Sequence, residues 1–332
     1  MDQFLIIRLS SLGDIIHALP AFAALRKAFP QARIRWAVEK KGGEILDLVP
    51  GIDEVIVVGK KRWQRSLREM KQRDQIALDF QGLVKSALWA FLSRSRRRIG
   101  FSRQNLKEPM ASLFYTECAS PTPEEEVHVI QKNLRLLERL GVRETRLEFP
   151  LRIPEAIDRS VRSKLSTLGR KEGQRIAVFN MGAAWESKRW FPEKWSEFMA
   201  KAALKDCFPV LLWGSDEEKI LAETVAQKTG VPLAPFFSIP EVIALVKTAS
   251  LVVSGDSFAL QAACALDVPV VALFGPTNPV RNGPFRVRDK VIYARRRCSP
   301  CYKHECPTLD CLKAISAEEV AEAAQTLWQI NG

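Results

Sequence analysis

Phe4-Leu5-Ile6-Ile7-Arg8-Leu9-Ser10-Ser11-Leu12-Gly13-Asp14 is the stretch that says most about the fold. It opens with a short apolar run, typical of a buried strand, and passes through a glycine turn into a helical pattern that starts near Asp14. Backbone N–H groups at such a helix start favour anions. We therefore predict a strand, a turn and a helix, with Asp14 at the carboxyl edge of a sheet, where open α/β folds bind ligands.

The same alternation of short β-branched runs and amphipathic helical stretches continues along the chain, so the expected fold class is α/β with parallel sheets. Strands are predicted over 4–8, 33–38, 55–58 and 75–80 in the first half, and over 175–180, 209–213, 251–254 and 269–274 in the second. Predicted helices include 15–29, 83–93, 125–140 and 316–328. A chain of 332 residues with this repeated rhythm predicts two domains, with a boundary near 149–154.

The start of the chain and its cysteines indicate a compartment. Met1 leads directly into the first expected strand, without the features of a secretion signal. No apolar run approaches the ~20 residues that a membrane-spanning helix needs. Seven cysteines, an odd number, favour reduced thiols over a disulfide framework. We expect a cytoplasmic protein, soluble or peripheral to a membrane.

Positive charge is concentrated in the first half. The formal net charge is +12, and the segment from Lys60 to Arg103 holds thirteen basic residues against three acidic ones, Glu69, Asp74 and Asp79. Such a field attracts polyanions, including nucleic acid, an anionic membrane surface and a phosphorylated glycolipid. Any single side chain of this segment is equally compatible with a solvated helix face, and both interpretations stay open.

Asp14 and His17 are three residues apart and share a helix face. A carboxylate at this edge suits a general base. It is equally suited to capping the helix. His17 could steady Asp14 or contact a substrate, and a purely structural histidine is the alternative.

Three loops of the second half follow expected strands. Ser254-Gly255-Asp256-Ser257 offers backbone amides to a phosphate, while Asp256 could bond a ribose or only cap the next helix. The stretch 182–190 supplies two cations and two aromatic rings, with Lys188 as the candidate for binding a diphosphate. The stretch 213–218 could present a carboxylate to a nucleoside or form a cap with an acidic first turn.

A cluster of cysteines lies near the end of the chain, at Cys298, Cys301, Cys306 and Cys311. Four thiolates can hold a structural zinc ion, although the outer spacings are shorter than in most zinc sites. The motifs G-x-G-x-x-G after the first strand, G-x-x-x-x-G-K-[ST], H-E-x-x-H and G-x-S-x-G are absent from the sequence. Nicotinamide enzymes, P-loop NTPases, zincins and α/β-hydrolases are therefore disfavoured.

These motifs together resemble the ADP-heptose:lipopolysaccharide heptosyltransferases, glycosyltransferase family 9, along nearly the whole chain. The stretch 10–20, SSLGDIIHALP, is similar to the first-strand signature of that family. Further similarities follow in order at 79–86 (DFQGLVKS), 98–101 (RIGF), 188–190 (KRW), Asp256, 270–276 and the cysteine-rich tail. Agreement at so many ordered places is more specific than any single motif.

The resemblance implies a GT-B architecture of two facing Rossmann-like domains with an interdomain cleft. Residues 1–152 would bind the acceptor and 153–315 the nucleotide sugar. For the C-terminal helix over 316–332, packing on the N-terminal domain is one possible arrangement. It implies inverting transfer, without metal or cofactor, of heptose from ADP-L-glycero-D-manno-heptose to the Kdo/heptose inner core of lipopolysaccharide. The implied partners are ADP-heptose and an anionic glycolipid, either Kdo-lipid A or a heptosyl core, and no nucleic acid. The protein would be a monomer that binds this glycolipid at the cytoplasmic face of the inner membrane.

The same resemblance implies roles for single residues. Asp14 would be the general base that takes the proton of the acceptor hydroxyl. The implied donor-binding residues are Lys188, Glu218 or its neighbour Glu217, Asp256, Ser257, Phe258 and Gln261. The implied acceptor-binding residues are Ser10, Ser11, Gly13, His17, Lys60, Lys61 and Arg62.

The chain departs from the family pattern at the donor loop. Where the family usually has Asp-Thr-Gly followed by a histidine, this sequence has Asp256-Ser257-Phe258 and then Gln261. Phe258 cannot approach a phosphate as glycine does, and Gln261 cannot carry charge. Ala183 and Ala184 stand where two hydroxyl residues often bind the diphosphate.

Other functions stay open beside this one. A related GT-B glycosyltransferase with another donor or acceptor fits the changed donor loop. A sugar-nucleotide epimerase of similar form would need acid/base pairs, for which the second half offers few candidates. A basic nucleic-acid-binding protein is suggested by the pI near 9.5, but the sequence contains no recognised nucleic-acid module.

Overall fold

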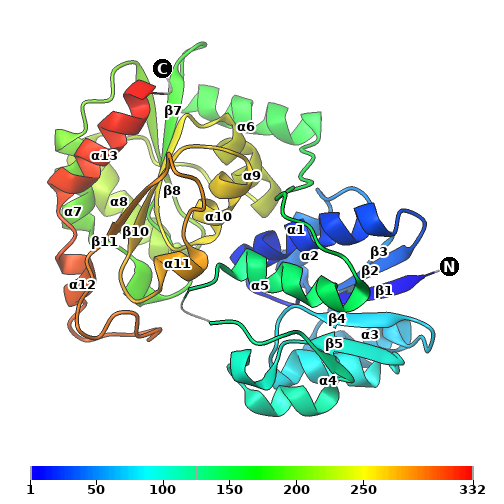
Figure 1. Ribbon diagram of the computed structural model, residues 1–332. Coiled ribbons are helices and arrows are strands. Elements are labelled where there is room, and N and C mark those ends of the chain that lie inside the picture. The colour runs from blue at the N-terminus through cyan, green and yellow to red at the C-terminus, as the bar shows by residue number, and fades with distance from the viewer. Residues whose placement is uncertain (1, 124–125, 331–332) are drawn as a thin grey trace. The chain divides into compact units, whose positions relative to one another are not determined.

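The computed structural model describes residues 2–123 and 126–330. These fall into two units, Met1–Arg152 and Ile153–Gly332, and each contains one parallel sheet covered by helices (Figure 1). The α/β fold class predicted from the sequence is confirmed. Among the described residues, every helix is too short or too polar to span a lipid bilayer.

The first unit is built on a six-stranded sheet in the order β3-β2-β1-β4-β5-β6. Its strands are β1 (Gln3–Ile7), β2 (Arg33–Glu39), β3 (Glu54–Val58), β4 (Ile76–Asp79), β5 (Arg97–Gly100) and β6 (Glu117–Cys118). The four strands expected here are found. The sequence did not predict β5 and β6, because RRIG and a pair of residues carry no apolar run.

Helices cover both faces of this sheet. Figure 1 shows α1 (Leu12–Ala28), α2 (Lys40–Leu46) and α5 (Val129–Leu136) on one face and α3 (Trp63–Met70) and α4 (Val84–Leu92) on the other. This change of face follows from right-handed crossovers, because the chain moves across the sheet in one direction from β1 to β3 and in the other from β4 to β6. Short 3-10 helices complete the unit: η1 (Lys60–Arg62), η2 (Arg103–Asn105), η3 (Pro109–Phe114) and η4 (Leu137–Leu140).

The helix expected over 125–140 is shorter than predicted. Its start at residue 125 lies outside the described residues, and α5 begins only at Val129. The cause is His128, which has extended backbone and whose side chain accepts a hydrogen bond from the Ile130 N–H at 3.2 Å. The predicted end is confirmed, because Gly141 takes the left-handed conformation, with φ at +75°, after η4.

The second unit has a five-stranded sheet in the order β11-β10-β9-β7-β8. Its strands are β7 (Arg175–Asn180), β8 (Cys207–Leu212), β9 (Leu251–Gly255), β10 (Val270–Phe274) and β11 (Lys290–Tyr293). Its helices are α6 (Glu155–Thr167), α7 (Pro192–Lys201), α8 (Asp216–Thr229), α9 (Ile239–Thr248), α10 (Phe258–Ala265), α11 (Pro279–Asn282), α12 (Asp310–Lys313), α13 (Ala317–Ile330) and the 3-10 turn η5 (Glu186–Lys188). All four strands expected in this half are present.

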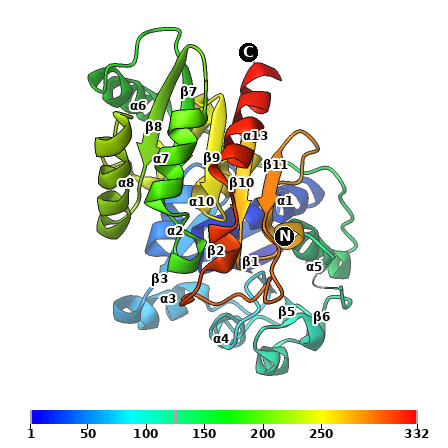
Figure 2. The same cartoon turned by 90° about the vertical axis from the view of Figure 1, so that its left-hand side faces the viewer.

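The C-terminal helix α13 packs within the second unit. It lies beside α7 in front of the sheet (Figure 2), and Leu327 and Trp328 join Trp195 and Phe198 of α7 in one buried cluster. The Trp328 indole N–H donates to the Lys205 carbonyl at 2.9 Å. This apolar helix face is therefore covered by the core of its own unit. Packing of the helix on the N-terminal domain stays a prediction.

Glu241 links two helices of the second unit. Its carboxylate accepts hydrogen bonds from Lys164 and Ser160 of α6, both at 2.7 Å, and from the Ser238 N–H at the start of α9, at 2.9 Å. Burial raises the pKa of this carboxyl, but the hydrogen bonds from the three donors have the larger combined effect. They lower the pKa from the ordinary 4.5 to about 2. The link is therefore made by the ionised form.

We expect Glu241→Gln to lower the free energy of unfolding at neutral pH by about 1–3 kcal/mol, because a charged hydrogen-bond acceptor is lost. The stabilisation should be complete above the ordinary pKa and should fade as pH falls towards about 2. Urea unfolding of both proteins across this range measures it. Glu155→Gln is the matched control, because Glu155 pairs with Arg159 along α6 with both side chains mostly exposed and should change stability little. A difference independent of pH would contradict the assignment.

Candidate functional site

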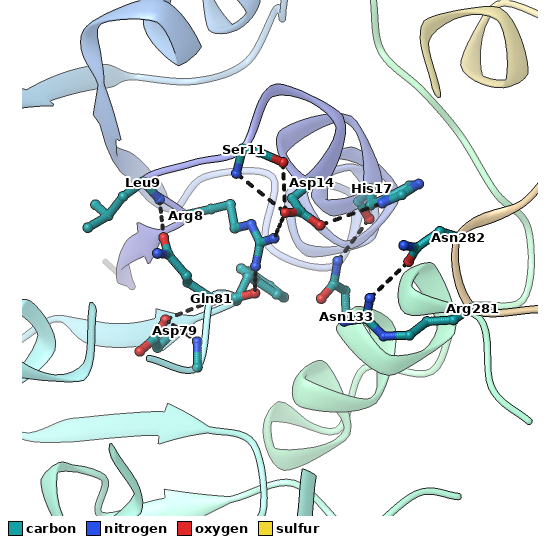
Figure 3. A network of polar contacts seen from close by, with 12 residues as sticks. Arg8, Leu9, Ser11, Asp14, His17, Asp79, Gln81, Asn133, Arg281 and Asn282 are labelled. Atoms are coloured by element: carbon teal, nitrogen blue, oxygen red, sulfur yellow. Dashed lines mark hydrogen bonds and ion pairs between the residues drawn. The ribbon is translucent and has the colours of Figure 1, made fainter. Parts of the chain in front are cut away.

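The order of the first sheet creates a natural binding edge. The chain moves away from β1 on one side and from β4 on the other, and ligands of open α/β sheets bind at the carboxyl ends of two such strands. Hydrogen bonds join these two ends (Figure 3): the Leu9 N–H donates to Gln81 Oε1 at 2.8 Å, and Arg8 Nη1 donates to the Phe80 carbonyl at 2.5 Å. Asp14 lies at this edge.

The Asp14 carboxylate is held in one orientation. Arg8 Nη2 lies 2.6 Å from Asp14 Oδ2, and the Ser11 hydroxyl donates to the same oxygen at 2.9 Å (Figure 3). The Asp14 side chain is 31% exposed, whereas that of Arg8 is 9% exposed. Asp14 is not the N-cap considered from the sequence, because α1 begins at Leu12 and Asp14 is its third residue. The result is an oriented, solvent-accessible carboxylate.

His17 lies behind this carboxylate. Its Nδ1 is 3.9 Å from Asp14 Oδ1, its ring meets His128 edge to face at 5.6 Å, and its carbonyl accepts from Asn133 Nδ2 at 2.9 Å. The residue is buried, with 4% of its surface exposed. This buried position beside Asp14 favours a role for His17 in orienting the Asp14 carboxylate over the contact with the acceptor that the resemblance implied.

Asp79 fixes the loop that carries Gln81. It is fully buried and accepts hydrogen bonds from the hydroxyls of Tyr115 and Ser86, at 2.7 and 2.8 Å, and from the N–H groups of Gln81 and Gly82. Burial raises the pKa of this carboxyl despite the four donors. Asp79 therefore serves to shape the edge, because no part of it is accessible to a substrate.

The expected acceptor residues are distributed along the same edge. Ser10 and Ser11 lie in the turn between β1 and α1, Gly13 is the second residue of α1, and all three are partly or fully exposed. Lys60, Lys61 and Arg62 form η1, which follows β3, and all three are exposed. Because β2 lies between β3 and β1, these cations start about 10 Å from the Asp14 turn across the sheet. Within the described residues, none of the three cations is paired with a carboxylate.

The second sheet has a binding edge of the same kind, between β7 and β9. Asn180 at the end of β7 places Nδ2 within hydrogen-bond distance of three acceptors, the Ser254 and Ser257 hydroxyls, both at 3.0 Å, and the Gly182 carbonyl at 2.7 Å. Ser257 is the N-cap of α10. The backbone N–H groups at this helix start therefore lie at the ends of two central strands, an arrangement that suits an anion.

Lys188 is the cation of this edge. Its Nζ lies 2.7 Å from Asp256 Oδ2 and 4.0 Å from the centre of the Trp185 ring, which stacks on His304 at 4.1 Å. The backbone at Gly255 passes close to the backbone at Lys188, because a Cβ on Gly255 would lie 2.7 Å from the Lys188 carbonyl oxygen. The structure thus brings Lys188, Asp256 and Ser257 together, as expected, and gives Asp256 a partner other than a ribose.

Glu217 and Glu218, two neighbouring residues of α8, differ sharply in the exposure of their side chains. The Glu218 side chain is 11% exposed and accepts from the Gly214 N–H at 2.7 Å, with Arg189 Nη2 at 3.8 Å. The Glu217 side chain is 79% exposed and pairs with Arg189 at 3.2 Å. A Cβ on Gly182 would overlap the Glu218 carboxylate, so this glycine leaves room for it. Of the two candidates for donor binding, Glu218 is therefore the one held in place at the carboxyl edge of the second sheet.

The residues that depart from the family pattern lie in α10 and in the loop that follows β7. Phe258 is the first residue of α10 and half-buried. Gln261 is 3% exposed, and its Nε2 donates to the Asn282 carbonyl at 2.8 Å, which ties α10 to α11. Ala183 is buried and its carbonyl accepts from Arg189 Nε at 2.9 Å, while Ala184 is exposed. Gln261 therefore has a structural contact that the sequence did not suggest.

The zinc site considered for the clustered cysteines finds no support. All seven cysteines are free thiols. Across residues 2–123 and 126–330, no group of three or more His, Cys, Asp and Glu side chains is arranged to hold a metal ion. The cysteine-rich segment instead braces the Lys188 loop, because Ser187 donates from Oγ to the Lys303 carbonyl at 2.6 Å and from N–H to the His304 carbonyl at 3.2 Å.

Comparison with known proteins decides the family. The model of glycosyltransferase family 9 (heptosyltransferase) matches residues 61–312. The chain belongs to glycosyltransferase family 9. The matched range contains every donor-binding candidate of this family 9 glycosyltransferase, whereas Asp14 precedes it. The family expected from the sequence is confirmed, and with it a transferase activity.

Similar proteins extend the comparison to nearly the whole chain. Lipopolysaccharide heptosyltransferase 1 of Pseudomonas aeruginosa is 29% identical to this family 9 glycosyltransferase over 319 residues, 92% of this chain and 87% of the relative. The protein of the same name from Escherichia coli K12 is 28% identical over 312 residues, 89% and 94% of the two chains. The structure of E. coli heptosyltransferase WaaC with ADP matches with a TM-score of 0.73 and 25% identity, covering 98% of this chain and 99% of that one. The GT-B fold class is thereby confirmed.

Proposed function

We propose that this chain transfers heptose from ADP-heptose to the inner core of lipopolysaccharide. Family membership supports the reaction class, and the two relatives named lipopolysaccharide heptosyltransferase 1 support this donor sugar and this acceptor. The ADP in the similar E. coli structure supports the nucleotide. The observation that carries the proposal is the oriented carboxylate of Asp14 at the carboxyl edge of the first sheet.

Asp14 acts as the general base. The acceptor hydroxyl oxygen attacks the anomeric carbon of the heptose, the bond from that carbon to the β-phosphate oxygen breaks, and ADP leaves. The hydroxyl proton passes to the Asp14 carboxylate. Attack from the face opposite the leaving group inverts the anomeric configuration. Arg8 and Ser11 are positioning residues, because both bind Oδ2 and fix the direction of the carboxylate.

The second unit binds the leaving group. Lys188 and the backbone N–H groups at the start of α10 stabilise the negative charge that develops on the β-phosphate. Ser257 donates its hydroxyl to a phosphate oxygen, and Asp256 positions Lys188 through their ion pair at 2.7 Å. Phe258 and Gln261 lie on the same helix and shape the donor site beside it.

The acceptor is an anionic glycolipid, Kdo-lipid A or a heptosyl core. Lys60, Lys61 and Arg62 bind its anionic groups, because they are exposed and unpaired within the described residues and lie on the edge that carries Asp14. Ser10, Ser11 and Gly13, at the junction of β1 and α1, contact the sugar that is attacked. The protein works as a monomer in the cytoplasm, at the inner membrane, without a metal ion.

A donor panel tests this function. Purified protein with Kdo-lipid A and EDTA is offered ADP-heptose, ADP-glucose and a UDP-sugar, and release of the nucleoside diphosphate is measured. We expect rapid release from ADP-heptose alone. Release from another sugar nucleotide only would retain the glycosyltransferase and reject this donor, with Phe258 and Gln261 as the first residues to examine.

Glu218 contacts the ribose of the donor. We expect Glu218→Gln to raise KM for ADP-heptose by roughly 10- to 100-fold, with a smaller effect on kcat, because a buried charged acceptor is lost. Initial-rate kinetics over a donor series measure both constants. Glu217→Gln is the matched control and should leave KM nearly unchanged, since Glu217 is mostly exposed. Equal effects of the two substitutions would reject the assignment of Glu218.

A further inference from the structure

Four large apolar side chains are exposed on two elements of the first unit. They are Leu88 and Phe91 on α4, 40% and 49% exposed, and Met110 and Leu113 on η3, 60% and 69% exposed. Each pair is three residues apart, so its members share one face of their helix. These four side chains are called the apolar patch below.

The two elements that carry the apolar patch are neighbours. The Val84 N–H at the start of α4 donates to Glu108 Oε2, just before η3, at 2.7 Å. At the other end, the rings of Phe91 and Phe114 meet edge to face at 5.8 Å. The patch is therefore one surface built from two helices, and contiguous exposed apolar surface on a soluble protein marks an interaction site.

Positive charge dominates the segment that carries the apolar patch, although Lys85 and Arg97 are paired with Glu39 and Glu117. The segment 85–116 contains seven basic residues and one acidic residue, Glu108. Arg98 lies over the Phe91 ring, with its guanidinium carbon 5.6 Å from the ring centre, and donates to the Phe114 carbonyl at 2.7 Å. Arg103 and Lys107, between β5 and η3, are exposed. The patch is thus apolar at its centre and cationic at its rim.

This combination fits one partner. A second copy of the chain would bring the same positive charge to the interface, and a nucleic acid would leave the aliphatic side chains without an apolar contact. A bilayer with anionic headgroups satisfies both features: apolar side chains enter the boundary of the acyl region, and basic side chains bind the headgroups. We propose that the apolar patch docks the first unit on an anionic phospholipid bilayer.

The position of the patch relates docking to the reaction. The start of α4 follows β4 and so lies at the carboxyl edge that also carries Asp14, and from there α4 runs back along the sheet through Leu88 to Phe91. A glycolipid acceptor would lie in the same bilayer, with its sugars towards this edge. That link rests on the proposed function, whereas bilayer binding itself does not.

Vesicle flotation tests the docking surface. The full chain is mixed with phosphatidylcholine vesicles and with mixed phosphatidylcholine–phosphatidylglycerol vesicles. We expect binding to the anionic vesicles only, weakened by salt. Phe91→Ser with Leu113→Ser should lower the partition coefficient at least about tenfold. Arg103→Gln with Lys107→Gln should lower it by about fivefold for each charge lost.

Ile220→Ser with Val287→Ser is the matched control, because these apolar side chains are 63% and 104% exposed but lie in the second unit. Binding unchanged in the Phe91/Leu113 variant, or lowered as much in the control, would overturn the proposal. So would a Phe91/Leu113 variant that converts a dimer to a monomer without affecting vesicle binding, because the occupant would then be a second copy.

Transfer assays separate this proposal from the proposed function. With a deacylated, water-soluble acceptor, the Phe91/Leu113 variant should match the unmodified protein, whereas with acceptor in vesicles its rate should fall. If no protein transfers heptose at all, the proposed function fails, and the flotation result still decides the docking surface.

Discussion

Replacing Asp14 by asparagine is expected to lower kcat/KM for heptose transfer by roughly 10²- to 10⁴-fold, the usual range for loss of a general base. Asparagine has the same shape, and its oxygen can still accept from Ser11, but it cannot take the acceptor proton. Initial rates of ADP release with saturating Kdo-lipid A measure the effect. ADP binding, measured by calorimetry, should be unchanged, because Asp14 has no proposed role in holding the nucleotide.

Two further variants make the Asp14 result interpretable. Arg8→Met removes the ion pair at 2.6 Å but leaves the carboxylate, so it should reduce kcat less than Asp14→Asn does. Asp53→Asn removes another aspartate that pairs with an arginine of the same unit, Arg26, and should leave the rate near normal. Equal activity of Asp14→Asn and the unmodified protein would remove Asp14 as the base.

Replacing Lys188 by alanine is expected to lower kcat by about 10²- to 10³-fold, because one preorganised charge that stabilises the leaving diphosphate is lost. The same change leaves Asp256 without its partner, and the Asp256 side chain is only 8% exposed. Breaking such a pair on one side costs about 3–5 kcal/mol of folding stability. Steady-state kinetics and urea unfolding measure the two effects separately.

A double variant separates catalysis from folding. Lys188→Met with Asp256→Asn removes both charges, so it should recover much of the lost stability while transfer remains slow. Recovery of both stability and rate would mean that Lys188 acts only as a structural partner of Asp256.

Local sequence was sufficient for much of the fold. Strands such as β1 and β7 are continuous apolar runs, which a parallel sheet buried on both faces requires. The helix start before Asp14 and the polar run at Asp256 were recognisable because each follows such a strand, although α1 begins at Leu12 and contains Gly13 instead of following it. The C-terminal helix was also predicted, but nothing in its sequence indicated that Leu327 and Trp328 would pack against α7.

The contacts that complete the sites could not be predicted in this way. Arg8 bonds the carbonyl of Phe80, 72 positions away, and Asn180 bonds Ser254, 74 positions away. These pairs meet only because the sheet order places β1 beside β4 and β7 beside β9. A single sequence gives the residue types at each strand end, whereas the partners depend on strand order.

The most direct test of the central claim is the mass of the lipid product. Kdo-lipid A is incubated with ADP-heptose and the purified protein, with EDTA present throughout, and the glycolipid is analysed by mass spectrometry. We predict an increase by one heptosyl residue that requires the protein and is strongly reduced in Asp14→Asn. An unchanged glycolipid mass, with folded protein that binds ADP-heptose, would contradict heptose transfer to this acceptor.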